Sequence, residues 1–186
     1  MTRLPLVPSD TDDPRLAPTF DYFRRRDRDV PPLYRALGNS PDMLQAWIDL
    51  AWPLRLKATS PRGQRELVIM RVAQLTGSTT EWLAHWDMAL VHGITPEQLA
   101  DLKWWTGSER FSDVERAVLQ FTDELTVDLE VSDDTYELLE QHFGPPEIVE
   151  LTLTAAFYSC VARVLSAIRV DHEPDESRLA VMHADG

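Results

Sequence analysis

The stretch "RELVIMRVAQLTGSTTEWLAHWDMALVHGITPEQLADL", residues Arg65–Leu102, decides the fold of this chain. It contains an apolar helical pattern that ends at Gly77, a second that ends at Gly93, and a third that begins at Thr95-Pro96. Glycine marks the carboxyl end of a helix, while threonine followed by proline marks the start of the next. The stretch therefore predicts three consecutive helices joined by short turns.

The same signals continue along the rest of the chain. Ser-Pro at Ser40 and Ser60, and Ser-Asp at Ser112 and Ser132, are typical helix starts. Pro53 should kink or end the helix that begins after Ser40. No segment shows a convincing strand alternation, and an apolar segment from about 145 to 170 is expected to be the longest helix. These patterns predict an all-α protein of about seven or eight helices.

The length of 186 residues allows one domain with a substantial core. Residues 1–30 begin with a segment rich in proline and aspartate, without helical periodicity, and are expected to form a loose N-terminal arm. Residues 31–170 are expected to form the helical domain, and residues 171–186 a polar C-terminal tail. These boundaries predict one folded domain with two loose ends.

Composition narrows the classes of function. With 44% hydrophobic and 26% charged residues the chain is typical of a soluble globular protein, and no apolar run approaches the roughly 20 residues of a membrane span. A net charge of −13 disfavours nucleic-acid binding. The N-terminus lacks the apolar region of a secretory signal, and Cys160, the single cysteine, cannot form an internal disulfide. We therefore expect a cytoplasmic protein that binds neither membrane nor nucleic acid.

Ser78 and Glu81 can be interpreted in two ways. As S-x-x-E they predict a capping box, in which the serine hydroxyl and the glutamate carboxylate satisfy each other's backbone amides. Glu81 also lies four residues before His85, so the two share a helix face and could form an acid–base pair. Both interpretations remain open from spacing alone. A third, a metal site that adds His92 or Glu66 to Glu81 and His85, has no second ligand cluster to support it.

Several motifs in this order resemble the superfamily of carboxymuconolactone decarboxylases and AhpD-like alkylhydroperoxidases. They are Arg65-Glu66-Leu67 opening an apolar helix, Gly77, Glu81-Trp82-x-x-His85, and Gly93-Ile94 before a Thr-capped helix. The segment "AAFYSCVARVLSAIRV" near the C-terminus also resembles the closing helix of the decarboxylase-like branch. The resemblance covers roughly residues 40–170 and implies the AhpD-like helical fold.

The peroxidase branch of this superfamily uses a glutamate followed by C-x-x-C-x-x-x-H. Mapped onto this chain, the glutamate falls on Glu66, the two cysteines on Ser78 and Glu81, and the histidine on His85. A hydroxyl and a carboxylate cannot cycle through a disulfide, so dithiol peroxidase activity is disfavoured. The resemblance is therefore to the branch that lacks the cysteine pair.

That branch implies cofactor-independent acid–base chemistry, a decarboxylation or a related lyase or isomerase step, on a small carboxylated or cyclic substrate. Glu81 and His85 would transfer protons, with support from Glu66 behind His85, from Ser78, and from Arg71 as a carboxylate clamp. The pocket residues would be Trp82, Trp86 and His92. Arg71 could equally form a structural salt bridge.

The resemblance also implies a homo-oligomer, a trimer or a hexamer, with a dimer as the alternative, and neither a metal nor a cofactor. Two other functions remain open at this point. One is a non-catalytic, oligomeric helical binding or scaffold protein in which Ser78 and Glu81 serve only as a cap. The other is a residual peroxidase activity through Cys160.

Overall fold

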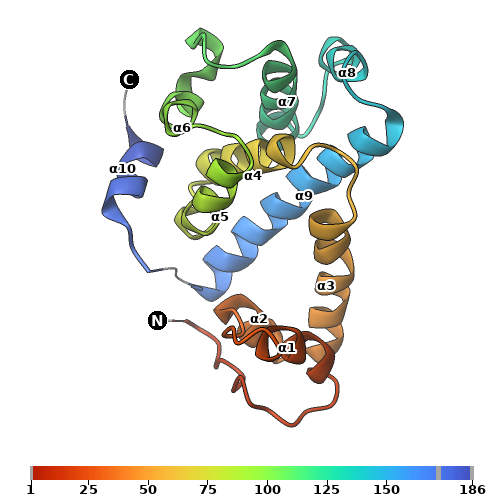
Figure 1. Cartoon of the computed structure of the whole chain (residues 1–186), viewed down its shortest axis with the longest axis vertical. Helices are drawn as coiled ribbons and strands as arrows, with labels where there is room; N and C mark the ends of the chain where they lie inside the picture. The colour runs from red at the N-terminus through yellow and green to blue at the C-terminus, as the bar shows by residue number, and fades with distance from the viewer. Residues whose placement is uncertain (1, 171–172, 185–186) are drawn as a thin grey trace. The chain divides into compact units, whose positions relative to one another are not determined.

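The computed structural model describes residues 2–170 and 173–184, which contain ten α-helices and no β-strand (Figure 1). The predicted all-α class is confirmed, but the predicted number of seven or eight helices is too low. Two short helices, α1 (Ala17–Arg24) and α10 (Glu176–His183), lie in segments whose many prolines and aspartates hide any apolar periodicity. The chain divides into two compact units, which are described separately below.

The first unit comprises residues up to 57 and the segment from 165 to 170. It contains α1, α2 (Pro32–Leu37) and α3 (Pro41–Leu56), which continues past Pro53 to its end. Residues 1–30 are therefore not simply a loose arm, because α1 buries Phe20 completely against the other two helices. The buried side chains of this core are Leu16, Phe20, Val30, Tyr34, Leu44 and Ile48.

The second unit contains residues 65–102. Its helices are α4 (Arg62–Thr76), α5 (Thr79–Val91), α6 (Pro96–Asp101), α7 (Asp113–Asp123), α8 (Asp133–Glu140), most of α9 (Pro145–Ile168), and α10. A 3-10 segment, Leu102–Gly107, follows α6, and a π-helical segment, Glu124–Asp128, follows α7. The three consecutive helices predicted from residues 65–102 are thus present as α4, α5 and α6.

The predicted helix starts are confirmed most clearly at three positions. Thr95 forms a capping box with Gln98, in which each side chain satisfies the backbone amide of the other residue, and the Glu115 carboxylate accepts hydrogen bonds from the backbone amide and the hydroxyl of Ser112. The hydroxyl of Ser132 accepts a hydrogen bond from the backbone amide of Thr135. These caps fix where α6, α7 and α8 begin, and they leave the turns between these helices short.

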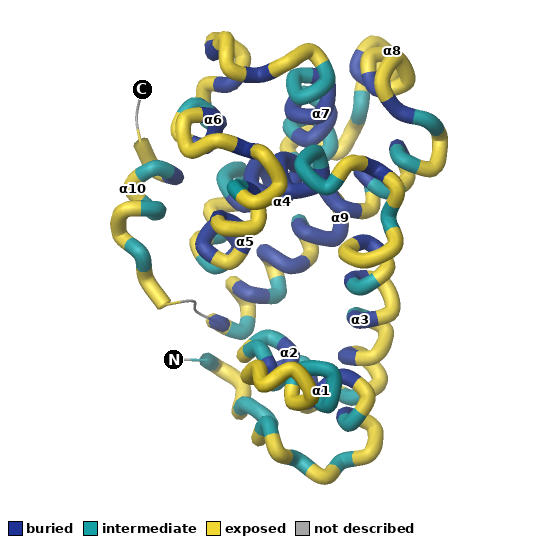
Figure 2. The backbone as a smooth tube through the Cα atoms, viewed as in Figure 1, coloured by how far each residue is buried: buried dark blue, intermediate teal, exposed yellow. Residues whose placement is uncertain are grey.

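Helix α4 lies at the centre of the second unit. Its residues from Arg65 to Ala73 are all buried, and Figure 2 shows this helix dark blue among the other helices. A helix that is buried on every side is normally apolar all round, whereas α4 carries three buried ionisable residues, Arg65, Glu66 and Arg71. Because burying a charge is costly unless it is compensated, the partners of these three side chains show what α4 is built to do.

The C-terminal segment that the sequence presented as a loose polar tail contains α10, which packs on α5. The indole Nε1 of Trp82 donates a hydrogen bond of 2.9 Å to the backbone carbonyl of Arg178, whose guanidinium pairs with Asp87. Met182 is buried in the same core as Trp82 and Trp86. Helix α10 is therefore part of the second unit's core around α5.

Among the described helices, α9 has the length and the apolar composition of a membrane span, and 44% of its most apolar 18-residue window is buried inside the protein. The expectation that no apolar run approaches that length was therefore wrong. Leu151 and Ala155 have no exposed surface, and Tyr158 and Val161 are also buried. These four residues form the side of α9 that packs into the protein core.

Candidate functional site

The turn between α4 and α5 brings Glu66 and His85 together. Gly77 closes α4 with φ at +68°, a left-handed conformation that glycine adopts without strain, and Ser78 then starts α5. The chain reverses there, and α5 packs along α4. The Oε2 atom of Glu66 lies 2.8 Å from Nδ1 of His85, and both side chains are buried. The sequence reasoning that placed Glu66 behind His85 anticipated this neighbour, although spacing alone could not locate the contact.

The carboxylate of Glu66 has a second partner, the guanidinium of Arg62, which pairs with Oε1 one helical turn earlier in α4. Burial alone would raise the pKa of Glu66, but the hydrogen bond from His85 and the charges of His85 and Arg62 outweigh it and lower the pKa below its usual value. Glu66 is therefore ionised at neutral pH. An ionised Glu66 at Nδ1 favours the tautomer with the proton on Nδ1, which makes Nε2 the basic nitrogen of His85.

Glu81 occupies a different electrostatic environment one turn away on α5. Its side chain is 2% exposed, and neither carboxylate oxygen has a hydrogen-bond partner of good geometry among the described residues. Burial raises the pKa of Glu81 to about 8, although the nearby Ser78 hydroxyl lowers it in part. Glu81 is therefore mostly protonated at neutral pH, whereas Glu66 is ionised.

The structure does not form the capping box expected from Ser78 and Glu81. Ser78 does stand at the N-cap position of α5, but among the described residues its side chain makes no capping hydrogen bond, and Glu81 makes none to the Ser78 backbone amide, although its carboxyl group lies near the Ser78 hydroxyl. The carboxyl group of Glu81 is instead buried, and its chain neighbour Trp82 has no exposed surface. Tertiary packing therefore overrides the local capping motif here.

Three residues near the pair were not assigned a role by the sequence reasoning. Tyr158 of α9 packs edge-on against the His85 ring, with centroids 5.0 Å apart. Arg62 could have been found from its position four residues before Glu66 on one helix face. Arg65 is buried beside Glu66, and its Nη1 donates to the hydroxyl of Ser60, 2.9 Å away, and to the Ser60 carbonyl. No local pattern signals Tyr158, because its contact with His85 joins distant parts of the chain.

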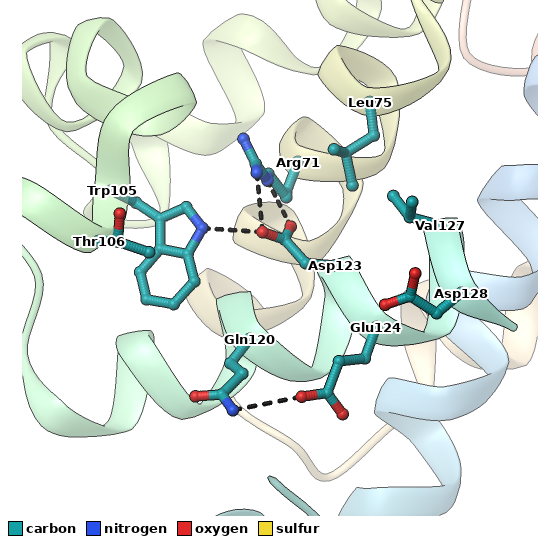
Figure 3. Close-up of a pocket in the computed structure, with 9 residues that line it drawn as sticks. All are labelled: Arg71, Leu75, Trp105, Thr106, Gln120, Asp123, Glu124, Val127 and Asp128. Carbon is teal, nitrogen blue, oxygen red and sulfur yellow. Dashed lines mark hydrogen bonds and ion pairs between the residues drawn. The ribbon is translucent and has the colours of Figure 1, made fainter. Parts of the chain in front are cut away.

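Arg71, the expected carboxylate clamp, contacts Asp123 of α7. Figure 3 shows its guanidinium facing Asp123 of α7, with Nε 2.5 Å from Oδ1 and Nη2 2.8 Å from Oδ2. The indole of Trp105 also donates to Oδ2 of Asp123, and Nη1 of Arg71 donates to the carbonyl of Leu102. Arg71 is therefore in a structural ion pair, the alternative weighed for it from the sequence.

The same ion pair lies at one pocket of the second unit, with a volume of about 450 Å³ (Figure 3). Glu66, Glu81 and His85 are not among its lining residues, so the structure does not join this pocket to the candidate site. The side chains that line it are Arg71, Leu75, Trp105, Thr106, Gln120, Asp123, Glu124, Val127 and Asp128.

The structure separates the residues expected to form a substrate pocket. Trp82 and Trp86 both pack into the core between α5 and α10, with their ring centroids 5.7 Å apart. His92 lies at the carboxyl end of α5 and is exposed. Among the residues that the structure describes, no three His, Cys, Asp or Glu side chains are grouped so as to hold a metal ion. The residues brought together are thus Glu66 and His85, with Glu81 one turn along α5.

Comparison with known proteins finds similarity to one family. The model of the carboxymuconolactone decarboxylase family matches residues 41–124, which include α4, α5, Glu66, Glu81 and His85. No curated protein matches the chain.

Solved structures share the fold at low sequence identity. A peroxidase-related protein from Ralstonia eutropha JMP134, described as an alkylhydroperoxidase AhpD core, is 18% identical with a TM-score of 0.76, covering 100% of this chain and 98% of its own. A peroxidase-related protein from Silicibacter sp. TM1040 is 21% identical with a TM-score of 0.75, covering 91% of each chain. A variant of the debrominase Bmp8 in complex with 2,3,4-tribromopyrrole is 16% identical with a TM-score of 0.79, covering 98% of this chain and 99% of its own. These similarities show an AhpD-like fold.

Proposed function

We propose that this chain, of which residues 41–124 match the model of the carboxymuconolactone decarboxylase family, is an enzyme that transfers protons without a cofactor on a small carboxylated or cyclic organic substrate. The reaction class is decarboxylation or a related lyase or isomerase step. His85 acts as the base through Nε2, Glu66 orients and stabilises its imidazolium form, and Glu81 acts as the acid.

One observation carries this proposal: two buried carboxyl groups on packed helices have their pKa values moved in opposite directions. Glu66 is held ionised by His85 and Arg62, while burial raises the pKa of Glu81 to about 8. Pairs of groups separated in this way supply a base and an acid at the same pH, which acid–base catalysis needs. A helical scaffold that needed Glu81 only as a cap would have no reason to bury it without a partner.

The other activities suggested by the resemblance have less support. A dithiol peroxidase needs two cysteines, and this sequence contains one, Cys160, which is exposed on α9. The debrominase of the same fold binds a small cyclic molecule, 2,3,4-tribromopyrrole, which supports a small cyclic substrate for a fold of this kind. That relative does not identify the substrate of this chain.

The proposal is tested by measuring turnover of small carboxylated lactones, beginning with carboxymuconolactone, in the wild-type protein and in His85→Gln. We expect the variant to lose between about 100-fold and 10,000-fold in kcat, the range of a general base, with its helical content unchanged. Glu130→Gln, which changes an exposed carboxylate outside the site, is the control and should keep full activity. If His85→Gln turns over the lactone as fast as the wild type, the proposed function is wrong.

The pH dependence gives an independent check on Glu81. Because an acid must carry its proton, wild-type turnover should fall as the pH rises through about 8. Glu81→Gln should lose most of its activity at every pH, because an amide cannot donate a carboxyl proton. A wild-type profile that stays flat up to pH 10 would exclude Glu81 as the acid.

A further inference from the structure

Arg65 is a buried cation that no carboxylate of the described residues pairs with. The residue is 4% exposed, and within the part of the chain that the structure describes its hydrogen bonds run from Nη1 to the carbonyl and hydroxyl oxygens of Ser60, which are both neutral. Its Nε atom is buried and has no hydrogen-bond partner among those same residues. By contrast, Arg71 on the same helix has a bidentate pair with Asp123. A buried guanidinium that forms no direct ion pair is only partly compensated, so an anion from outside the chain would stabilise it.

The surroundings of Arg65 are also positive. Arg62 lies three residues earlier, almost one turn away on α4, and its charge together with burial lowers the pKa of Arg65. Both arginines stand at the amino-terminal end of α4, where the helix dipole adds positive potential. That first turn contains no acidic residue, although acids are the usual complement to a helix N-terminus. Arg62 and the amino-terminal end of α4 therefore both add positive potential at Arg65.

The acidic groups near Arg65 are already engaged elsewhere. The carboxylate of Glu150 accepts hydrogen bonds from the backbone amides of Thr59 and Ser60, at 2.9 and 2.7 Å, and from the Thr59 hydroxyl. Glu66 binds His85 and Arg62. Both carboxylates attract Arg65 through space without forming an ion pair with it. The positive charge of Arg65 is thus only partly compensated.

The edge of the guanidinium that remains is the one suited to a carboxylate. Ser60 accepts hydrogen bonds from Nη1, whereas Nε is buried and makes no hydrogen bond with a described residue. The Nε–H and Nη2–H bonds are parallel and match the two oxygens of a carboxylate. Ser60 therefore fixes the orientation of the group while leaving this bidentate edge for a ligand.

Tyr158 connects this edge to the proposed base. Its ring packs against the imidazole of His85, and it is also close enough to Arg65 for the two side chains to interact electrostatically. Arg65 is also the chain neighbour of Glu66, which binds His85. An anion bound at Arg65 would consequently lie beside the residues assigned to proton transfer.

We propose that the Nε–Nη2 edge of Arg65, supported by Arg62 and the amino-terminal end of α4, binds the carboxylate of the substrate. This assignment deepens the proposed function. It rests on that function because the bound carboxylate is a substrate only if the protein is the proposed enzyme. It gives Arg65 the clamp role that the sequence reasoning gave to Arg71. It also defines the substrate class as a small organic carboxylate.

The probes are benzoate and benzamide, which have nearly the same shape but differ in charge. Titration calorimetry on the wild-type protein should show benzoate binding at least tenfold more tightly than benzamide. Arg65→Gln should weaken benzoate binding at least tenfold, with helical content and unfolding temperature measured in parallel. Arg110→Met, which removes an exposed arginine paired with Asp101, is the charge-matched control and should bind benzoate within twofold of the wild type.

Several outcomes overturn the proposal. Equal binding of benzoate and benzamide by the wild type does so without any variant. Benzoate binding within twofold of the wild type in folded Arg65→Gln does so as well. If that variant does not fold, Arg65→Lys decides, because lysine keeps the charge but lacks the fork; we expect at least fivefold weaker binding, and unchanged binding would overturn the clamp.

His85→Gln separates this inference from the proposed function. It should abolish turnover but bind benzoate within about fivefold of the wild type, since the clamp does not include the imidazole. If benzoate binds through Arg65 while His85→Gln keeps full turnover, the carboxylate site stands and the acid–base assignment fails. If His85→Gln loses turnover while Arg65→Gln binds benzoate normally, the acid–base assignment stands and the carboxylate site at Arg65 fails.

Discussion

The carboxylate of Glu66 lies 2.8 Å from Nδ1 of His85, although the two residues are 19 positions apart in the chain. Glu66 has no exposed surface, so the contact is made in a region of low dielectric, where charge interactions are strong. The second oxygen of the same carboxylate pairs with Arg62. One side chain therefore links the start of α4 to the middle of α5, and it should matter for both stability and activity.

Glu66→Gln should destabilise the protein by about 3–5 kcal/mol, because Arg62 would then be left nearly buried without its carboxylate. Urea denaturation of the variant and the wild type at pH 7 measures this difference. Glu130→Gln, which changes an exposed carboxylate, should stay within about 0.5 kcal/mol of the wild type. A loss below about 1 kcal/mol in Glu66→Gln would show that the pair contributes little.

The raised pKa of Glu81 predicts a pH dependence of the free energy of unfolding. The folded protein keeps this proton up to about pH 8, whereas the unfolded chain releases it near its ordinary value of 4.5. Between these values the folded state binds more protons, so this group lowers stability by about 1.4 kcal/mol for each pH unit. The loss in the free energy of unfolding that Glu81 causes is absent below pH 4.5 and complete above pH 8.

Glu81→Gln removes this titration, so its stability relative to the wild type should increase steadily from pH 5 to pH 8. Urea denaturation at four pH values in this range tests the expectation. Glu97→Gln, at an exposed position in α6, should show no such trend. Parallel stability curves for Glu81→Gln and the wild type would mean that Glu81 is ionised in the folded protein.

Ser78→Ala and Ser112→Ala should differ although both serines occupy N-cap positions. The Ser112 hydroxyl donates a hydrogen bond to the carboxylate of Glu115, which also accepts one from the Ser112 backbone amide, and loss of the hydroxyl should cost about 1 kcal/mol. Ser78 makes no capping hydrogen bond, so its replacement should cost less than about 0.5 kcal/mol. Chemical denaturation of both variants measures the two costs, and an equal loss in both would restore the capping interpretation of Ser78.

Cys160→Ser tests the peroxidase alternative directly. Cys160 is exposed and is the single thiol of the sequence, so its replacement should change stability by no more than about 0.5 kcal/mol. We expect no thiol-dependent consumption of organic hydroperoxide by the wild type above a protein-free control. Turnover that is present in the wild type and absent in Cys160→Ser would support a single-cysteine peroxidase instead.

Local patterns predicted the helices that have local causes. The Thr95–Gln98 and Ser112–Glu115 boxes lie within one turn each, so spacing in the sequence was enough to place the starts of α6 and α7. Ser78 and Glu81 show the same spacing but behave differently, since the packing around Trp82 buries Glu81. The same local spacing therefore gives a cap at one helix start and none at another, depending on the tertiary packing around it.

The partners of the buried charges could not be predicted in this way. Within the described residues, Arg71 forms an ion pair and Arg65 does not, because Asp123 lies beside Arg71 although it is 52 residues away in the sequence. The resemblance brought attention to Glu66, Glu81 and His85, but spacing carries no information on burial, which decides that Glu81 keeps its proton. Such assignments depend on contacts between helices that are distant in sequence.

The hydrogen bond from Trp82 to the backbone of Arg178 has a consequence for biosynthesis. Because α10 covers the face of α5 that holds Trp82 and Trp86, that face cannot be closed until residues 176–183 have been translated. Helix α5, which carries His85, thus leaves the ribosome long before α10 does. In the interval the side chains of Trp82 and Trp86 are exposed and accessible to chaperones. Final closure of this core is therefore a late event in the life of the nascent chain.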